Sequence, residues 1–225
     1  MSENQIHPTA IIHPNAKIGS GNYIGPYCVI GENVTIGSFN RLESHVCIGS
    51  PAEHKIAFHG EIDSGVVIGD NCIFREFVTI NSGTEQATFV GNNVYMLRGS
   101  HLGHDAIIQD KVTLSCNVMI GGHSVVKQGT NIGLGAVVHQ RVTINKYSMV
   151  GMGSVVTKDI MPFFLGWGSP FKHQKLNVLG MERNGFSAKQ IKSLDDYCFY
   201  VLNNKPNDYA YLAIDDLLDR AGFTV

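Results

Sequence analysis

The sequence predicts an all-β fold, a parallel β-helix, followed by a small C-terminal α-helical segment. Apolar residues recur every six residues through most of the first 156 residues, and glycine follows many of them, as after Ile18, Ile24 and Ile30. Glycine is abundant, with 25 residues among 225, and it suits a backbone that bends repeatedly with positive φ. A fixed period of this kind is the signature of a repeat architecture.

Stepping by six residues gives three apolar frames, from Ile6 to Ile48, from Ile56 to Ile80 and from Val90 to Val156. Only 44% of the chain is hydrophobic, so composition alone does not explain three frames in which every sixth residue is apolar. An α-helix would spread this period around its circumference, whereas short strands joined by turns place every sixth residue on one inward column. Three strands then make a coil of eighteen residues, and successive coils stack at about 4.8 Å.

The slips between frames indicate how the chain is organised. They predict two loops extruded from the coils, near residues 50–60 and 82–89. We assign residues 1–165 to the β-helix and residues 166–225 to a C-terminal helical region. The helices expected there are 187–204, which Ser187 caps, and 207–221.

Composition and charge limit the function classes. With 17 basic and 19 acidic residues, the chain offers no broad cationic surface, so we expect no nucleic-acid partner. Its five cysteines lack close pairing, as in a reduced intracellular protein. We see neither a signal peptide nor an apolar stretch near the ~20 residues of a membrane span. A cytoplasmic protein without a membrane span is therefore expected.

Polar residues collect on neighbouring coils of the predicted β-helix. Residues eighteen apart overlie one another, which aligns His104 with Gly122 and Gln140, and Asp105 with His123. The whole cluster consists of His101, His104, Asp105, Gly122, His123, His139 and Gln140. The histidines are either polar turn residues on a solvated face or a functional site. Because a repeat scaffold has no need of clustered histidines, we favour the site.

Two chemistries suit such a cluster. The imidazole of His104, beside the carboxylate of Asp105, suits proton transfer near neutral pH. Three imidazoles could instead bind zinc with an open position for water. The spacing from His101 to His104 is a weak metal signal, because many surface loops contain it. We expect a general base and no metal.

The motifs around the cluster resemble one known family. They run, in chain order, from Arg75 to Thr84, Ser100 to Asp105, Ile120 to His123, Val138 to Gln140 and Gly185 to Ser187. Their order and spacing resemble those of the UDP-N-acetylglucosamine acyltransferases, hexapeptide-repeat enzymes that begin lipid A synthesis. The resemblance covers nearly the whole chain. It implies left-handed coils, which the period alone does not specify, and a homotrimer with active sites at subunit boundaries.

The resemblance also implies roles for single residues. His104 would be the general base, Asp105 its orienting partner, and the Gly122 amide the donor to an oxyanion. The residues expected to contact substrate are His101, His123, His139, Gln140, Glu53 and Lys55, with Asn177 and Arg183 near the nucleotide. The implied reaction moves a 3-hydroxyacyl group from an acyl carrier protein thioester, or from acyl-CoA, to the 3-position of a UDP-amino sugar. No acyl-enzyme and no cofactor are expected.

Some positions depart from the family pattern. The chain is shorter than usual, Leu179 stands where the family often has glutamate, and Asn184 stands where a second arginine often follows Arg183. Met152 replaces a glycine of longer-chain relatives, which implies a shorter acyl group. These departures leave open an N-acyltransferase acting on a nucleotide-linked amino sugar for surface polysaccharide. A γ-type zinc carbonic anhydrase and a non-catalytic scaffold are the alternatives from other classes.

Overall fold

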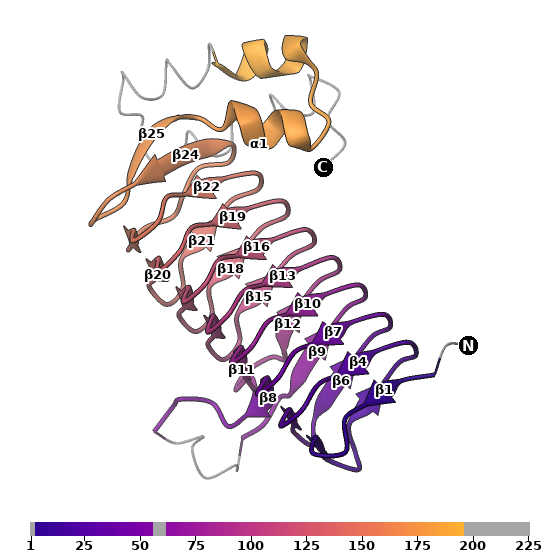
Figure 1. The fold of residues 1–225 in the computed structure, drawn as a ribbon. Helices are drawn as coiled ribbons and strands as arrows, with labels where there is room; N and C mark the ends of the chain where they lie inside the picture. Colours follow the sequence, from indigo (N-terminus) through magenta and orange to yellow (C-terminus); the bar gives the residue numbers. More distant parts are fainter. Residues whose placement is uncertain (1–2, 56–61, 196–225) are drawn as a thin grey trace.

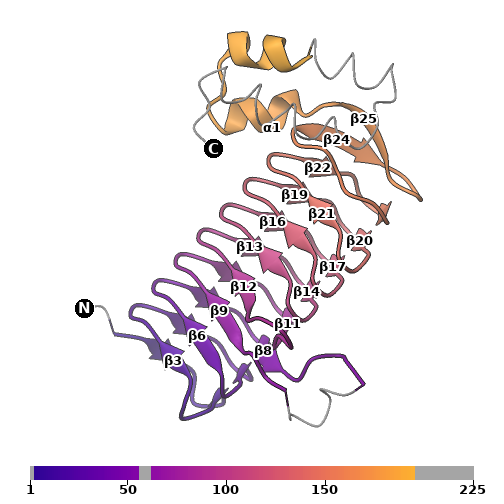
Figure 2. The ribbon, with the colours of Figure 1, turned by 180° about the vertical axis from the view of Figure 1, so that it is seen from behind.

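The computed structural model describes residues 3–55 and 62–195. These residues form a three-sided prism in which successive strands pass through three sheets in turn (Figures 1 and 2). The N-terminal strand lies at one end of the prism, and the C-terminal elements cover the other end (Figure 1). Pairing along the prism is parallel throughout, except for the last strand of the first sheet. The parallel β-helix predicted by the six-residue period is therefore present.

The strands are short, and most contain two residues. The first sheet contains β1 (Gln5–Ile6), β4 (Tyr23–Ile24), β7 (Arg41–Leu42), β10 (Ile73–Phe74), β13 (Tyr95–Met96), β16 (Thr113–Leu114), β19 (Asn131–Ile132), β22 (Met149–Val150), β24 (Phe164–Trp167) and β25 (Lys172–Leu176). The second contains β2 (Ile11–Ile12), β5 (Val29–Ile30), β8 (Cys47–Ser50), β11 (Thr79–Asn81), β14 (His101–Leu102), β17 (Met119–Ile120), β20 (Val137–Val138) and β23 (Val155–Val156). The third contains β3 (Lys17–Ile18), β6 (Val34–Ile36), β9 (Val66–Ile68), β12 (Thr88–Val90), β15 (Ile107–Ile108), β18 (Val125–Val126) and β21 (Thr143–Ile144).

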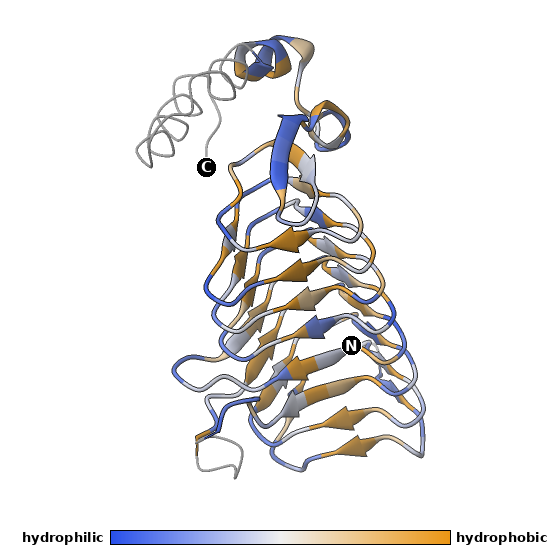
Figure 3. Cartoon of the chain, turned by 90° about the vertical axis from the view of Figure 1, so that its left-hand side faces the viewer, coloured by the Kyte–Doolittle hydropathy of each residue, from blue (hydrophilic) through white to orange (hydrophobic). Residues whose placement is uncertain are grey.

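The core contains the column of sixth residues, together with buried residues two positions before many of them, such as Val46 and Val112. Ile24 pairs with Leu42, and Leu102 pairs with Ile120, each pair eighteen residues apart. These side chains are at most 1% exposed, and burying each one stabilises the fold by about 1.5–3 kcal/mol. Apolar residues recur along the strands of successive coils (Figure 3). One-residue register errors would turn every such side chain outward, so the column fixes the register.

Two insertions interrupt the coils. Leu42 pairs with Phe74, fourteen residues beyond a regular coil, because the chain leaves the prism between β8 and β9. Ile68 pairs with Val90, four residues beyond a regular coil, because of extra residues between β11 and β12. The expected frame through Ile62 is wrong. Ile62 is 40% exposed and lies in the first insertion, so the buried column resumes only near Ile68; Ile56 lies outside the described residues.

The C-terminal elements begin with a strand pair. β24 continues the first sheet in parallel with β22, and β25 folds back antiparallel to it. Helix α1 (Val178–Arg183) follows, and residues 188–195 are also helical. Neither β25 nor α1 was predicted from the sequence, because a five-residue edge strand and a six-residue helix are too short for a periodic signal. The division at residue 165 stays a prediction.

The predicted start of the 187–204 helix at Ser187 is confirmed. The Ser187 N–H donates to the Gln190 Oε1 at 2.8 Å, and the Ser187 hydroxyl accepts from the Gln190 N–H at 3.4 Å, as in a capping box. Ile191 and Leu194 are buried, as the sequence indicated. The remainder of 187–204 and all of 207–221 lie outside the described residues. None of the helices described here has the length and apolar character of a membrane span.

His173 ties the strand pair to the end of the prism. Its Nε2 accepts a hydrogen bond from the Met161 N–H at 3.1 Å, and its ring packs edge-on against Phe164 and Phe171. Burial lowers the pKa of His173 from 6.5 to about 4. Protonating this ring would remove the acceptor and place a charge among aromatic rings.

We predict that the protein loses stability as the pH falls from about 6.5 to about 4, the interval between the unfolded and folded pKa values of His173. In that interval the unfolded chain binds the proton and the folded chain does not, so protonation favours unfolding. Urea unfolding at several pH values measures the slope of the free energy of unfolding against pH. His173→Gln keeps a hydrogen-bond acceptor without titrating, and its slope in this interval should be smaller; an equal slope would contradict the assignment.

Candidate active site

The histidine cluster lies where the second sheet turns into the third. His104 and Asp105 follow β14, and His123 stands at the same corner one coil further on. Asp105 and His123 have φ values of 62° and 58°, a left-handed conformation that turns the chain sharply. The His123 N–H donates to the His104 carbonyl at 2.9 Å. The structure therefore brings these three residues together, as the eighteen-residue spacing predicted.

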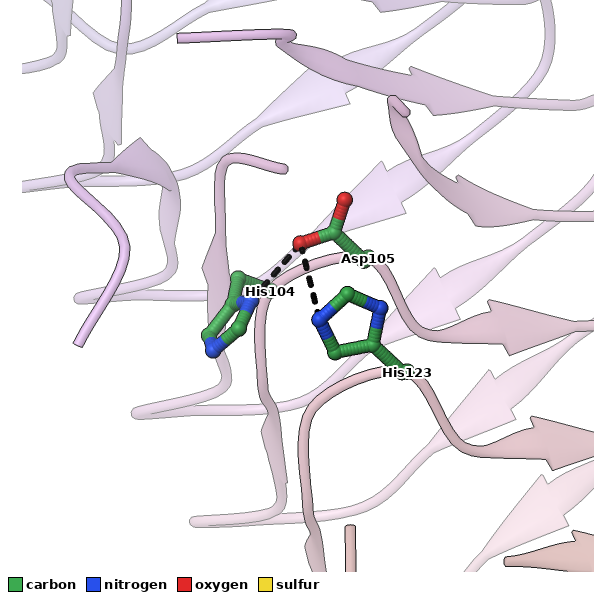
Figure 4. Close-up of side chains that lie close together, drawn as sticks. All are labelled: His104, Asp105 and His123. Carbon is green, nitrogen blue, oxygen red and sulfur yellow. Dashed lines mark hydrogen bonds and ion pairs between the residues drawn. The ribbon is translucent and has the colours of Figure 1, made fainter. Parts of the chain in front are cut away.

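His104 and Asp105 form a close pair. The His104 Nδ1 lies 2.7 Å from the Asp105 Oδ2, and Figure 4 shows the two side chains in contact. An ionised carboxylate only accepts hydrogen bonds, so the proton of this contact belongs to His104 Nδ1. His104 Nε2 then carries the lone pair. His104 is 14% exposed and Asp105 is fully buried, so the imidazole is reachable while the carboxylate is not.

Gly122 lies directly beside the basic nitrogen. A Cβ placed on Gly122 would come within 2.9 Å of His104 Nε2, so a side chain at this position would displace the His104 ring. The Gly122 N–H makes no hydrogen bond within the described part of the chain. An amide donor and a basic nitrogen thus sit next to each other, which is the pairing that proton transfer to and from an acyl centre uses.

A second set of donors surrounds Asp105. The backbone N–H groups of Thr84, Glu85 and Gln86 and the Thr84 hydroxyl all donate to its carboxylate, at 2.7–3.0 Å. Burial alone would raise the pKa of Asp105. The hydrogen bonds from Gln86, His104 and Thr84 outweigh burial and hold the pKa of this carboxyl well below its usual range. Asp105 is therefore an anion at every physiological pH.

His101 and the first inserted loop complete this corner. The His101 Nδ1 lies 2.8 Å from the Thr79 hydroxyl, and its Nε2 lies 3.8 Å from the Glu53 carboxylate. Burial lowers the pKa of His101, and Glu53 partly opposes that shift. The predicted residue Glu53 thus reaches the cluster. Lys55 follows in the same loop and is exposed.

His54 is not among the site residues predicted from the sequence. Its ring centroid lies 6.0 Å from that of His104, with the two rings nearly edge-to-face, while the ring of His123 approaches His104 to 5.1 Å. His54 stands between Glu53 and Lys55, but no column arithmetic applies inside an extruded loop. Only the folded loop places its imidazole against His104.

Of the other predicted residues, two continue the histidine corner on the next coil and two lie at another corner. His139 and Gln140 are exposed, one coil beyond His123, and His139 Nδ1 contacts the Gln140 carbonyl at 3.1 Å. Asn177 and Arg183 line a pocket of about 290 Å³ between the first sheet and α1. Asn177 is 8% exposed. Its side chain caps α1 by accepting a hydrogen bond from the Gly180 N–H. The same side chain donates to the Tyr147 carbonyl.

The pocket of Asn177 and Arg183, here the α1 pocket, lies at a different corner from the histidines. Its walls include Lys111, Thr130 and Asn131, which come from the turns between the third and first sheets and from the first sheet itself. Among the described residues, no carboxylate lines it. Met152 lies at the remaining corner, between β22 and β23, and is 74% exposed. The three groups that the sequence linked to one reaction thus occupy three corners of one prism.

The hydrogen bonds of Asp105 bear on whether the cluster could hold a metal. Ligand atoms of His104, Asp105 and His123 lie within 4.8 Å of one another, the one such group in the described residues. Both carboxylate oxygens of Asp105 already accept several N–H and O–H donors, and His104 Nδ1 donates to one of them. A cation would have to displace these donors, so the arrangement favours proton transfer over metal ligation.

Comparisons with known proteins identify the family. A family model for UDP-N-acetylglucosamine O-acyltransferase, domain 2, matches residues 159–213. The acyl-[acyl-carrier-protein]--UDP-N-acetylglucosamine O-acyltransferase of Caulobacter vibrioides is 45% identical over 210 residues, 84% of this chain and 79% of the relative. The Sinorhizobium fredii enzyme of the same name is 35% identical over 213 residues, 86% and 79% of the two chains. The chain belongs to the UDP-N-acetylglucosamine O-acyltransferase family.

The solved structures agree with this assignment. The crystal structure of the UDP-N-acetylglucosamine O-acyltransferase from Moraxella catarrhalis is 31% identical, with a TM-score of 0.79 over 96% of this chain and 91% of that chain. The fold expected from the sequence, a left-handed parallel β-helix with a C-terminal helical segment, is confirmed. As a member of this family, the protein is an acyltransferase.

We predict that catalysis by this acyltransferase needs no metal. Chelator should leave the initial rate unchanged, and metal analysis of the purified protein should find well under one zinc ion per chain, because Asp105 and His104 Nδ1 are occupied by each other. A rate that falls with chelator and returns with zinc would contradict this reading.

Proposed function

We propose that the protein transfers a 3-hydroxyacyl group from an acyl carrier protein thioester to the 3-hydroxyl of UDP-N-acetylglucosamine. The single observation that carries the mechanism is the position of His104 Nε2 beside the Gly122 amide, with Nδ1 held by Asp105. The names of the relatives supply the substrates. The step would belong to lipid A synthesis in the cytoplasm, with acyl-CoA as the alternative donor.

The reaction follows from these three residues. His104 Nε2 takes the proton of the acceptor hydroxyl as its oxygen attacks the thioester carbonyl, and the Gly122 N–H stabilises the oxyanion that forms. When the carbonyl re-forms, the C–S bond breaks, and His104 returns the proton to the departing thiolate. Asp105 stays ionised and stabilises the imidazolium between the two steps. The products are the acyl ester and the free thiol of the carrier.

An acyl-enzyme is not part of the proposal. Among the described cysteines, none lies at the histidine corner, and Cys28 and Cys72 are buried in the coils. Burial raises the pKa of the Cys28 thiol, and it raises that of Cys72 to about 11. A thiol is a nucleophile only as the thiolate, so these cysteines are inert packing residues.

We further propose a homotrimer with substrate bound between copies. The histidine corner and the α1 pocket lie on different corners of one prism, so one substrate can contact both only if they belong to neighbouring subunits. Lys111 and Arg183 would attract the diphosphate of a sugar nucleotide into the pocket. His101, His123, His139 and Gln140 would contact the sugar and acyl groups from the histidine corner, with Glu53 and Lys55 from the inserted loop.

Met152 fits the same arrangement. Its side chain is exposed on a single chain, and a neighbouring subunit would cover it in the trimer. A thioether at the end of the acyl groove would occupy the space of several methylenes, each worth about 0.8 kcal/mol when buried. We therefore propose that Met152 favours short acyl donors.

One observation favours an amino sugar as a second candidate acceptor of the acyl group. Leu179, which is 56% exposed, lines the α1 pocket where the family often has glutamate. The same base and amide would also serve attack by an amine on an amino sugar. Mass spectrometry of products from UDP-N-acetylglucosamine and from amino-sugar nucleotides separates O-acylation from N-acylation.

His104→Ala is expected to lower turnover by about 10² to 10⁴, the usual contribution of a positioned general base. The thermal midpoint should change little, because the side chain is not part of the apolar column. Steady-state rates with acyl carrier protein and UDP-N-acetylglucosamine give the answer. Retention of more than half the activity would remove the base assignment.

Complementation between subunits tests the shared site. Co-expressed chains carrying His104→Ala and Arg183→Ala should recover activity, with about a quarter of the sites intact if trimers mix at random. The control pairs His104→Ala with Asp105→Asn; every site then carries a lesion at the histidine corner, so no recovery is expected. If the first mixture is no more active than the sum of its parents, the two groups do not act across subunits.

A further inference from the structure

The second insertion forms a loop around Asp105. Four extra residues between β11 and β12 allow residues 83–87 to leave the coil and return, and we call this segment the 83–87 loop. It begins with a tight turn at Gly83, where a Cβ would collide with the Gln86 carbonyl. The Gly83 N–H and carbonyl pair with Gly65 and Ser64, and the Ser64 hydroxyl donates to the Thr84 carbonyl. The end of the first insertion therefore holds the loop in place.

The donors of this loop converge on one carboxylate. Asp105 Oδ1 accepts from the N–H groups of Thr84, Glu85 and Gln86 at 3.0, 2.7 and 2.8 Å. Asp105 Oδ2 accepts from the Thr84 hydroxyl at 2.8 Å and lies 2.9 Å from the Thr84 N. It is also the oxygen that accepts from His104 Nδ1 at 2.7 Å. A carboxylate offers about four lone-pair positions, so Asp105 is saturated.

We propose that Thr84 is a positioning residue for the acyl transfer, and that its hydroxyl, with the amides of the 83–87 loop, fixes which nitrogen of His104 is the base. The inference rests on the proposed function of His104. The Thr84 hydroxyl contacts the Asp105 carboxylate. It acts through Asp105, whose oxygens it orients.

Saturation of Asp105 has two consequences for the proton. The donors of the loop stabilise the ionised carboxylate, so His104 keeps the proton on Nδ1, and the proton that Nε2 takes from the hydroxyl is available to the leaving thiolate. The same carboxylate requires a donor on His104 Nδ1, which keeps Nε2 unprotonated in the resting enzyme and directed at Gly122. The loop thereby prevents the other tautomer, in which the lone pair would face a buried anion.

Thr84 is the member of the loop that a substitution can test. Its hydroxyl is the loop's only side-chain donor to the carboxylate, and it bonds the oxygen that holds His104. Thr84→Val removes the hydroxyl with little change in shape and leaves the backbone donors in place. Thr84→Ser keeps the donor and removes only a methyl group.

The test combines kinetics with the tautomer of His104. We expect Thr84→Val to lower kcat about tenfold, as loss of a charge-assisted hydrogen bond would, with KM within about twofold. Thr84→Ser should keep at least half of the wild-type kcat. In protein labelled with ¹⁵N at histidine, the His104 Nδ1–H tautomer should dominate in the wild type and lose population in Thr84→Val, with Asp105→Asn as the reference for its loss.

Matched controls separate the possible failures. Ser148→Ala deletes a buried hydroxyl hydrogen bond of 2.9 Å, to the Met161 carbonyl, and should lower the thermal midpoint as much as Thr84→Val without changing kcat. If Thr84→Val keeps the wild-type kcat and tautomer while His104→Ala is inactive, the role of Thr84 is wrong and the base remains. If His104→Ala is active, His104 is not the base, and the proposed function is wrong together with the role of Thr84. A fall in kcat that Thr84→Ser does not restore also overturns the proposal.

Discussion

The alignment of each sixth residue with its counterpart one coil away is the constraint on which the rest of the structure depends. The aliphatic column fills the prism, and the interstrand hydrogen bonds satisfy the backbone only in that register. Corners between sheets therefore recur at fixed positions. Side chains at a corner have defined neighbours one coil above and one coil below, and some of them, such as Ala106 and Val118, are buried in the core. Polar chemistry can accumulate there without disturbing the fold.

The two insertions leave the register of the coils unchanged. Leu42 pairs with Phe74 and Ile68 with Val90 as closely as any regular pair, although the connecting chain is longer. The extra residues fold outward and meet at the histidine corner, where one loop supplies Glu53 and His54 and the other surrounds Asp105. A buried anion is costly unless its hydrogen bonds are made, and here backbone amides make them. The regular coils provide the imidazoles, and the loops set their electrostatics.

The prism also limits what a single chain can do. Its walls are flat and its interior is filled, so groups at different corners face different directions. The α1 pocket, the histidine corner and Met152 each lie at a separate corner. A single substrate can bring them together only across a boundary between copies, which is why assembly and catalysis are linked in the proposed function.

The sequence by itself determined the coil, the stacking of Asp105 with His123, and the pairing of His104 with Gly122, because a six-residue period converts sequence distance directly into position. It also identified the Ser187 cap, a local signal. It did not determine where the column resumes after the first insertion, and Ile62 was assigned to the core only because its spacing fits by coincidence. The approach of His54 to His104, the donors that the 83–87 loop directs at Asp105, and the short elements β25 and α1 were decided by tertiary structure. Inside an insertion no repeat relates one residue to the next, and the contacts exist only because two extruded segments, far apart in the sequence, fold against the same corner.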